Sequence, residues 1–236
     1  MRTTAVITGA ATGIGRALAE ALHARGARLI LADVNADALA ETATRLDATA
    51  CTTDVADPDA MAALAEKAPR ANLICLNAGI VGAALGAPWE VPPDDWDRVF
   101  AVNVSGVVNG LRAFVPRLLA AGESAHVLIT GSLAGLTVFP GGGAYGPSKH
   151  AVVALAQHAA MVLADTPVSV SMICPALVAT GMSAEGEDPA DVAEQALRTI
   201  DDGVFAAAPE NWQRTVVTQT TNLVAGRQPT PPVPAD

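Results

Sequence analysis

The sequence predicts an α/β protein with a doubly wound parallel sheet, in which helices cover both faces to give three α/β/α layers. One observation is that short β-branched runs alternate with longer alanine-rich stretches along most of the 236 residues. Strands separated by helices in this way pair in parallel, and the helices lie on the two faces. The other is that 51% of the residues are hydrophobic but only 3% are aromatic. A core of Ala, Val, Leu and Ile suits a buried parallel sheet.

The expected elements follow one another along a single domain. The strand windows read TAVIT, RLILA, TACTT, NLICL, AHVLIT, VSVSMI and VFAAA, at residues 4–8, 28–32, 49–53, 72–76, 125–130, 168–173 and 204–208. Helices are expected over residues 14–25, 37–46, 59–68, 94–119, 147–163 and 189–200. We find no internal repeat and no linker, so residues 1–225 are predicted to form one domain. The remaining residues, 226–236, contain four prolines and form a proline-rich tail, which we expect to be poorly ordered or draped on a neighbour.

Charge and cysteine usage narrow the class of protein. The 24 acidic residues exceed the 14 Lys and Arg to give a net charge of −10, which argues against nucleic-acid or anionic-membrane partners. Cys51, Cys75 and Cys174 have no metal-ligand spacing and are expected to be buried free thiols, which fits a cytoplasmic protein. The N-terminus resembles no signal peptide, and no apolar run reaches the ~20 residues that a membrane span needs. We therefore expect no membrane association.

A glycine-rich turn separates the first predicted strand from the first helix. It reads TGAATGIG, and its candidate cofactor-binding residues are Gly9, Thr12, Gly13, Ile14 and Gly15. Glycines permit a tight turn and let backbone N–H groups approach a pyrophosphate, which the positive end of the helix dipole also attracts. The turn alone is a weak signal, because a plain strand-to-helix connection can look the same.

An acidic residue at the next strand strengthens the case for a dinucleotide. Asp33 closes the second strand, 20 residues after Gly13, where a carboxylate can accept hydrogen bonds from the adenosine ribose. The same carboxylate repels the 2′-phosphate of NADP, and neither Thr12 nor Val34 supplies the basic residue that this phosphate favours. The sequence therefore predicts NAD rather than NADP, with Asp33 and Val34 beside it.

Three further residues suggest acid–base chemistry. Tyr145 and Lys149 are four residues apart at the start of a predicted helix, so they can share one face. Ser132 follows a strand end, where open sheets present functional groups. A free tyrosine has a pKa of ~10, and an ammonium about 4 Å away lowers that pKa by about three units. Tyr145 is then a candidate acid and base for hydride transfer to a carbonyl, while Ser132 donates a hydrogen bond to the substrate oxygen.

With these residues in this order, the chain resembles the single-domain short-chain dehydrogenase/reductase family over nearly its whole length, which implies a Rossmann fold. The resemblance implies that Ser132, Tyr145 and Lys149 are catalytic, that Tyr145 and Lys149 also contact the cofactor, and that Asn103 holds a water in a proton relay behind Lys149. It implies further cofactor contacts from Asp54, Val55, Asn77, Ala78, Gly79, Pro175, Val178 and Thr180. Ala176 departs from the family, which often has glycine there, and fits if its φ is negative.

The sequence indicates less about the substrate pocket and the oligomeric state. Loops at residues 81–92, 133–144 and 176–188 are expected to form the pocket, and Trp89, Phe139, Leu177 and Met182 are its candidate apolar residues, with core packing as the alternative. The acidic cluster Asp94, Asp95 and Asp97 is explained by helix capping. Residues 151–163 are apolar on nearly every side, which predicts a homodimer, and the resemblance implies a homotetramer.

Three functions are compatible with these residues. The favoured one is an NAD-dependent dehydrogenase or carbonyl reductase that interconverts a secondary alcohol and a ketone, with a small, apolar molecule as substrate. A 3-oxoacyl-thioester reductase is an alternative, although Asp33 and the acidic charge weigh against it. A non-catalytic nucleotide-sensing protein on the same fold is the other alternative, although such a protein is expected to lose Tyr145 or Lys149.

Overall fold

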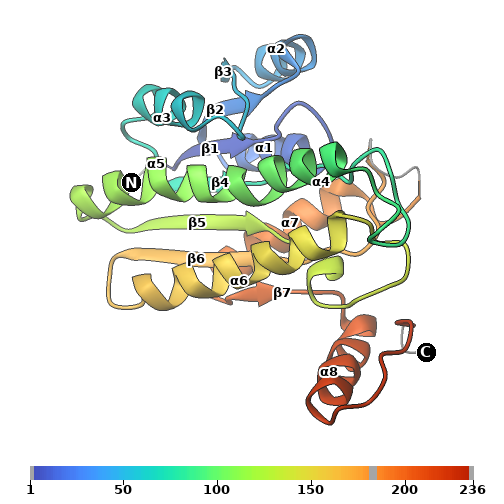
Figure 1. Cartoon of the computed structure of the whole chain (residues 1–236). Coiled ribbons are helices and arrows are strands. Elements are labelled where there is room, and N and C mark those ends of the chain that lie inside the picture. The colour runs from blue at the N-terminus through green and yellow to red at the C-terminus, as the bar shows by residue number, and fades with distance from the viewer. Residues whose placement is uncertain (1–2, 181–184, 234–236) are drawn as a thin grey trace.

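Seven parallel strands form one sheet in the order β3-β2-β1-β4-β5-β6-β7 (Figure 1) in the computed structural model, which describes residues 3–180 and 185–233. The strands are β1 Thr4–Thr8, β2 Arg28–Asp33, β3 Thr49–Thr52, β4 Leu73–Leu76, β5 Ala125–Thr130, β6 Val168–Ile173 and β7 Ala206–Ala207. The helices are α1 Gly13–Ala24, α2 Ala36–Arg45, α3 Pro58–Lys67, α4 Pro93–Phe100, α5 Gly106–Ala121, α6 Tyr145–Leu163, α7 Pro189–Asp201 and α8 Glu210–Val224. The doubly wound fold predicted from the sequence is confirmed.

The strand order creates a switch point between β1 and β4. Val6 of β1 lies opposite Ile30 of β2 on one side and Ile74 of β4 on the other. The chain winds outward from β1 in both directions, so the connections that follow β1 and β4 leave the sheet on opposite sides. Ligands of open α/β sheets bind at such a point, outside the carboxyl ends of the strands.

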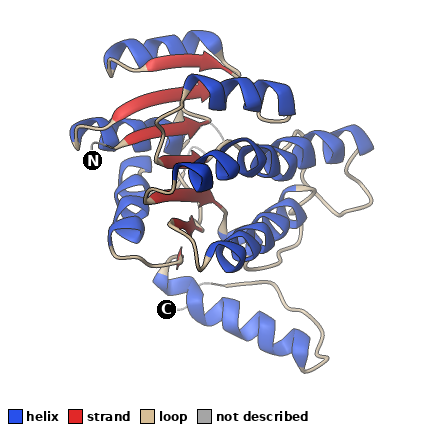
Figure 2. Ribbon diagram, turned by 90° about the vertical axis from the view of Figure 1, so that its left-hand side faces the viewer, coloured by secondary structure: helices blue, strands red, loops and turns tan. Residues whose placement is uncertain are grey.

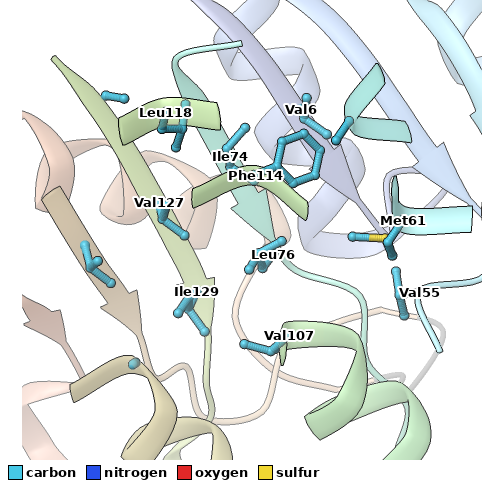
Figure 3. Packing of buried hydrophobic residues seen from close by; sticks show 14 of the residues in the cluster. Val6, Val55, Met61, Ile74, Leu76, Val107, Phe114, Leu118, Val127 and Ile129 are labelled. Carbon is cyan, nitrogen blue, oxygen red and sulfur yellow. The ribbon is translucent and has the colours of Figure 1, made fainter. Parts of the chain in front are cut away.

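Successive strand residues face opposite sides of the sheet and form two hydrophobic layers. Figure 2 shows helices on both sides of the twisted sheet. On one side, Val6, Ile74 and Ile129 pack under α3, α5 and α6, with Phe114 of α5 at the centre (Figure 3). On the other side, Ala5, Ile7 and Leu128 pack with α1, α2 and α7. Because every central strand is buried on both faces, the apolar runs continue along the strand instead of alternating.

Most element boundaries lie within two residues of their predicted positions, but the long helix differs in kind. The sequence predicts one helix over residues 94–119, whereas a π-helical segment, Ala101–Ser105, separates α4 from α5. Such π-bulges are frequent at functional sites, and this one carries Asn103. Helix α6 begins at Tyr145, two residues before the predicted start, because Pro147 is tolerated in a first helical turn.

One described helix was missed altogether. Helix α8 follows the last strand and buries none of its residues. Without a buried face its sequence, ENWQRTVVTQTTNLV, has no need of the regular apolar stripe by which a helix is recognised. Figure 1 shows α8 projecting from the edge of the sheet beyond β7.

Among the described residues, the helical stretch Pro93–Ala121, which comprises α4, the π-helical segment and α5, is long and apolar enough by length and composition to span a membrane. The sequence predicted no membrane span, because no run of consecutive apolar residues reaches the ~20 that a span needs. Core helices that cover a sheet pass the same test. Val107, Phe114 and Leu118 of this helix pack into the core against the sheet.

Candidate active site

A cavity of about 1010 Å³ lies at the carboxyl ends of the strands. It brings together most of the residues singled out in the sequence, from segments as far apart as the first glycine loop and the loop after β6. Those that line it are Gly9, Thr12, Gly13, Ile14, Asp33, Val34, Asp54, Val55, Asn77, Ala78, Gly79, Ser132, Tyr145, Lys149, Pro175, Val178 and Thr180. Gly15 and Asn103 do not line the cavity; they lie behind its wall.

The glycine loop needs two of its glycines for different steric reasons. Gly13 has a φ of +55°, a conformation that L side chains rarely adopt. Gly15 has an ordinary φ, but a Cβ on it would lie 2.0 Å from the backbone oxygen of Gly9. The first turn of α1 therefore packs directly on the end of β1, which brings the helix N-terminus to the cavity.

The N-terminus of α1 is not capped by a side chain. Its N-cap residue, Thr12, makes no side-chain cap hydrogen bond, in contrast to Asn35, Asp57 and Asp188 at the starts of α2, α3 and α7. The first N–H groups of a helix have no partner within the helix and carry its positive dipole end. At a cavity wall they suit the phosphates of a dinucleotide.

Asp33 is held in place by two backbone donors. The N–H of Ala11 donates to Oδ2 over 3.0 Å, and the N–H of Asn35 donates to Oδ1 over 2.9 Å. The carboxylate thus connects the glycine loop to the end of β2. Its neighbour Val34 is 71% exposed and also lines the cavity. This corner therefore presents one fixed negative charge and an apolar side chain.

Two threonines that the sequence analysis did not select hold the turn after β4. Oγ1 of Thr8 accepts hydrogen bonds from the backbone N–H of Asn77 and Ala78, over 3.0 and 3.1 Å. Thr130 donates from its hydroxyl to Oδ1 of Asn77 over 3.0 Å. The amide of Asn77 also donates to the backbone oxygen of Thr8 over 3.1 Å. Strand ends β1, β4 and β5 are thereby tied together under the cavity floor.

Ser132 and Tyr145 form a pair of hydrogen-bonded hydroxyl groups in the wall of the cavity. Ser132 ends the segment after β5, and Tyr145 is the first residue of α6. Burial raises the pKa of Tyr145, a hydrogen bond with the Ser132 side chain lowers it, and the nearby Cys174 raises it. The net direction is upward, so the prediction that the pKa of Tyr145 lies below its ordinary value is wrong here. Burial of the phenol is the largest cause of this shift.

Lys149 is buried one helical turn after Tyr145. Its Nζ donates to the backbone oxygen of Thr130 over 3.0 Å and lies 5.8 Å from the ring centroid of Tyr145. Burial lowers the pKa of Lys149 to about 8 from its ordinary 10.5. At neutral pH it remains mostly protonated, and its charge points to the sheet end and the tyrosine ring.

Asn103 joins the turn after β4 to the start of α6. Its Oδ1 accepts from the N–H of Ile80 over 2.8 Å, and its Nδ2 donates to the oxygen of Ile80 and to Oγ of Ser148, each over 2.9 Å. A Cβ on Gly79 would lie 3.3 Å from both Oδ1 of Asn103 and Nζ of Lys149. The amide and the ammonium therefore flank the same glycine.

The loop after β6 closes the cavity opposite the glycine loop. The oxygen of Pro175 accepts from the N–H of Leu133 over 2.8 Å, next to Ser132. A Cβ on Gly13 would lie 3.0 Å from Cγ2 of Thr180, so the two loops are close. Ala176 is not among the residues with positive φ, as its tolerance in place of glycine requires.

The predicted apolar pocket residues divide into two groups. Phe139 and Leu177 line the cavity, whereas Trp89 is 85% exposed and belongs neither to the cavity wall nor to the core. Met182 lies outside the described residues. Among the lining residues that the sequence analysis did not select are Arg98, Trp212, Pro231 and Pro232. The last three follow β7: Trp212 lies on α8, where no helix had been predicted, and Pro231 and Pro232 lie in the proline-rich tail that had been expected to be poorly ordered or draped on a neighbour.

Asp95 has a different partner from the one expected. Instead of capping α4, its carboxylate accepts hydrogen bonds from the N–H groups of Ala83 and Ala84 in the loop before the helix. These donors lower the pKa of Asp95 below its ordinary value. Among the residues that the structure describes, no three His, Cys, Asp or Glu side chains are grouped so that they could hold a metal ion.

Comparison with known proteins gives matches over most of the chain. A family model described as short chain dehydrogenase matches residues 3–190. A 1-deoxy-11-beta-hydroxypentalenate dehydrogenase of Streptomyces avermitilis is 42% identical over 190 residues, covering 76% of this chain and 70% of that protein. A 2-(R)-hydroxypropyl-CoM dehydrogenase of Xanthobacter autotrophicus is 36% identical over 211 residues, covering 85% and 84%.

A solved structure matches the whole architecture. It is a short chain dehydrogenase/reductase from Burkholderia phymatum in complex with NAD, which superimposes with a TM-score of 0.92 at 34% identity and covers 98% of each chain. The similarity extends beyond residue 190, where the family model ends, and so includes the region of β7 and α8.

Proposed function

Because the chain belongs to the short-chain dehydrogenase family and is an oxidoreductase, we propose that it interconverts a secondary alcohol and a ketone with NAD as its cofactor. The observation that carries this proposal is the convergence of Ser132, Tyr145 and Lys149 on a cavity whose other end carries Asp33. The names of two relatives of this chain indicate that they act on hydroxyl compounds. A small-molecule substrate follows from membership of the family.

The described residues fit a dinucleotide. The uncapped start of α1, with Thr12, Gly13 and Ile14, would hold the pyrophosphate, and Asp33 would hold the adenosine ribose. Asp54 and Val55 would contact the adenine, and Asn77, Ala78 and Gly79 would lie along the cofactor beside the floor of the cavity. Pro175, Val178 and Thr180 would hold the carboxamide end. Bound there, the nicotinamide supplies the acceptor or donor of hydride.

The preference for NAD over NADP rests on Asp33 and its surroundings. A 2′-phosphate at the ribose would meet the fixed carboxylate of Asp33 without a cation to offset it. The nearest arginine of α1, Arg16, lies 3.9 Å from Glu20 on the solvated side of the helix. The Burkholderia phymatum relative was solved with NAD. Calorimetric titration should give a lower Kd for NAD⁺ than for NADP⁺, and the reverse order would contradict this assignment.

Tyr145 and Ser132 would handle the proton and the substrate oxygen. In the reducing direction, the raised pKa keeps the phenol of Tyr145 protonated, so it can donate its proton to the developing alkoxide. Ser132 would donate a second hydrogen bond to the same oxygen and stabilise its charge. In the oxidising direction, Tyr145 must accept the alcohol proton, and the ammonium of Lys149 favours that phenolate electrostatically.

Lys149 and Asn103 would support this exchange from behind. We propose that Lys149 also binds the nicotinamide ribose and that Asn103 holds a water that returns the proton to solvent. The two side chains flank Gly79 at the back of the site.

The Tyr145→Phe variant tests the assigned chemistry. It keeps the ring and its packing but removes the only group proposed to transfer the proton. Alcohol oxidation with NAD⁺, followed at the absorbance of NADH, should fall by about 10²-fold or more, while the Kd for NAD⁺ stays within about twofold of wild type. Unchanged turnover in this variant would overturn the role of Tyr145.

We also propose that the protein is a homodimer or homotetramer that assembles through α6. Met161 and Val162 are 71% and 67% exposed near the end of this helix, where a second copy could cover them. Light scattering should give two or four times the mass of one chain. A mass equal to one chain would contradict the proposal.

A cytoplasmic location is proposed from cysteine chemistry. Cys51, Cys75 and Cys174 are free and buried, as expected in a reducing compartment. Fractionation of the native host with an antibody against the protein checks this, and recovery in the cell envelope would contradict it.

A further inference from the structure

The side of the cavity farthest along the sheet from Asp33 is formed by the C-terminal segment of the chain. Asp33 ends β2, whereas Trp212, Pro231 and Pro232 follow β7, the strand at the opposite edge of the sheet. All three line the same cavity as Tyr145. If the cofactor's adenosine lies near Asp33, the C-terminal residues lie toward the end that is left for the substrate.

The C-terminal arm, defined as α8 and residues 225–233, is a hairpin of a helix and a proline-rich tail. The chain turns at Gly226, and the tail then runs back along α8 toward the cavity (Figure 1). The hydrogen bonds that join the two limbs include Arg227 N to Asn222 O, 2.9 Å, Gln219 Nε2 to Thr230 O, 3.0 Å, and Thr215 Oγ1 to Val233 O. Prolines favour an extended, stiff conformation, so the tail keeps Pro231 and Pro232 at a fixed height along the helix.

One side chain fastens this arm to the loop before the catalytic tyrosine. Oε1 of Gln219 accepts from the N–H of Val138 over 2.8 Å, and Nε2 donates to the oxygen of Val138 over 2.9 Å as well as to Thr230. Gln219 thus contacts the loop and the tail at once. Because α8 buries none of its residues, apolar packing contributes little to its placement, and these polar contacts matter more.

The part of the cavity wall that includes the C-terminal arm is apolar. Phe139, next to Val138, lines the cavity together with Pro140, Leu177 and the three residues of the arm. The charged lining residues, Asp33, Asp54, Arg98 and Lys149, come from other segments. The cavity, about 1010 Å³, is at the upper end of the roughly 300–1,000 Å³ of small-molecule and cofactor sites, and its wall extends from Asp33 to the C-terminal arm.

We propose that the C-terminal arm is the wall that selects the substrate, a bulky ring-containing or branched apolar alcohol whose carbon skeleton contacts Trp212, Pro231 and Pro232. Gln219 is a positioning residue that holds this wall over the site. The proposal rests on the alcohol–ketone reaction proposed above, and it adds the class of substrate and the residues that recognise it.

Graded secondary alcohols test the proposal at saturating NAD⁺. The probes are 2-propanol, cyclohexanol and decahydro-2-naphthol, with wild type, Trp212→Ala and Gln219→Ala compared. The matched control is Gln213→Ala, because Gln213 is exposed on the same helix and is not a lining residue. For the fused-ring alcohol, Trp212→Ala and Gln219→Ala should raise KM about tenfold with kcat nearly unchanged. KM for 2-propanol and for NAD⁺ should stay as in wild type, and Gln213→Ala should change none of these values.

A second readout needs no substrate. Tryptic cleavage after Arg227 should be faster in Gln219→Ala than in Gln213→Ala, because the tail is released from the loop. Trp212→Phe, which keeps an aromatic ring, should recover part of the ring-alcohol KM and covers the case in which Trp212→Ala fails to fold.

The outcomes separate the two proposals. If wild type oxidises alcohols but the ratio of KM for decahydro-2-naphthol to KM for 2-propanol is the same in all variants, the arm does not select the substrate. Only this inference is then overturned. Equal tryptic cleavage in Gln219→Ala and Gln213→Ala would overturn the positioning role of Gln219. Absence of turnover by wild type on any alcohol or ketone would overturn the proposed function itself, and this inference with it.

Discussion

Asn103 donates a hydrogen bond from Nδ2 to Oγ of Ser148 over 2.9 Å, and both side chains are buried. The hydroxyl of Ser148 in turn donates to the backbone oxygen of Tyr145 over 2.7 Å. This pair therefore connects the π-helical segment before α5 with the first turn of α6, where the tyrosine and the lysine stand. A serine within the YGPSK sequence thus contacts the backbone of the helix start, whereas its neighbours Tyr145 and Lys149 line the cavity.

Replacing Ser148 with Ala should destabilise the protein by about 1–3 kcal/mol. The substitution leaves one buried proton of Asn103 Nδ2 without its acceptor and removes the donor to the oxygen of Tyr145. Urea unfolding followed by circular dichroism measures the change. Ser105→Ala, at an exposed serine two residues from Asn103, is the control and should stay within about 0.5 kcal/mol of wild type. Equal effects from the two substitutions would contradict the role of Ser148.

Replacing Lys149 with Met should stabilise the fold at neutral pH while abolishing turnover. A pKa lowered from 10.5 to about 8 means that the buried ammonium costs about 3 kcal/mol at pH 7. Loss of the hydrogen bond to Thr130 offsets about 1 kcal/mol of that gain. The net expectation is a free energy of unfolding about 2 kcal/mol above that of wild type, which urea unfolding at pH 7 measures.

The pH dependence of the same variant has a defined sign. Below pH 8 both the folded and the unfolded chain hold the proton of Lys149, so the advantage of the methionine is constant there. Between pH 8 and 10.5 the unfolded chain holds more protons than the folded one, so wild type gains stability and the advantage shrinks. Lys67→Met, at the other lysine of the chain and at an exposed position, is the control for removing a lysine from the surface. An advantage that grew with pH would contradict the burial argument.

The parts of the site that could be predicted are those that local spacing determines. Gly9, Gly13 and Gly15 occur within seven residues, and Tyr145 and Lys149 are one helical turn apart, so the order of residues alone suggests their geometry. Strands β1, β5 and β6 match their predicted bounds because each is a short, uninterrupted run between turns.

The parts that could not be predicted depend on contacts between distant residues. Thr8 and Asn77 are 69 residues apart, Asn103 and Ser148 are 45 apart, and Val138 and Gln219 are 81 apart. No periodicity relates such pairs until the sheet has been assembled. The predicted direction of the Tyr145 pKa shift was wrong for the same reason. The sequence shows the lysine, but the burial of the phenol depends on contacts that form only in the folded chain.

A double substitution at the end of β2 should convert the cofactor preference. Asp33→Asn removes the negative charge and keeps an oxygen for the N–H of Ala11, and Val34→Arg adds a cation at a side chain that already lines the cavity. If each change contributes about 1.4 kcal/mol toward the 2′-phosphate, the ratio of kcat/KM for NADP⁺ to that for NAD⁺ rises about a hundredfold. Steady-state kinetics with both cofactors measures the ratio, and Val34→Ala is the control that adds no charge. A ratio unchanged by the double substitution would remove Asp33 from the basis for cofactor choice.

Asp95 should stabilise the loop that contains Ala83 and Ala84, in a manner that depends on pH. Its carboxylate accepts from the N–H groups of Ala83 and Ala84, and these donors lower its pKa below 3.8. A lowered pKa means that the stabilisation is fully present above pH 3.8 and is lost as the pH falls through the folded value. Wild type should therefore unfold at higher urea than Asp95→Asn at pH 7, and the two midpoints should approach each other near pH 3.

The same variant should affect the substrate more than the cofactor. A Cβ on Gly143 would lie 2.9 Å from the backbone oxygen of Ala84. The loop that Asp95 holds therefore packs beside the segment that precedes Tyr145. Loosening that loop should raise KM for the alcohol and leave the Kd for NAD⁺ unchanged. Asp97→Asn, at an exposed position on the same helix, should alter neither the unfolding midpoints nor KM. If Asp97→Asn reproduced the effects of Asp95→Asn, general loss of negative charge on α4 would explain them, and the two backbone hydrogen bonds would not.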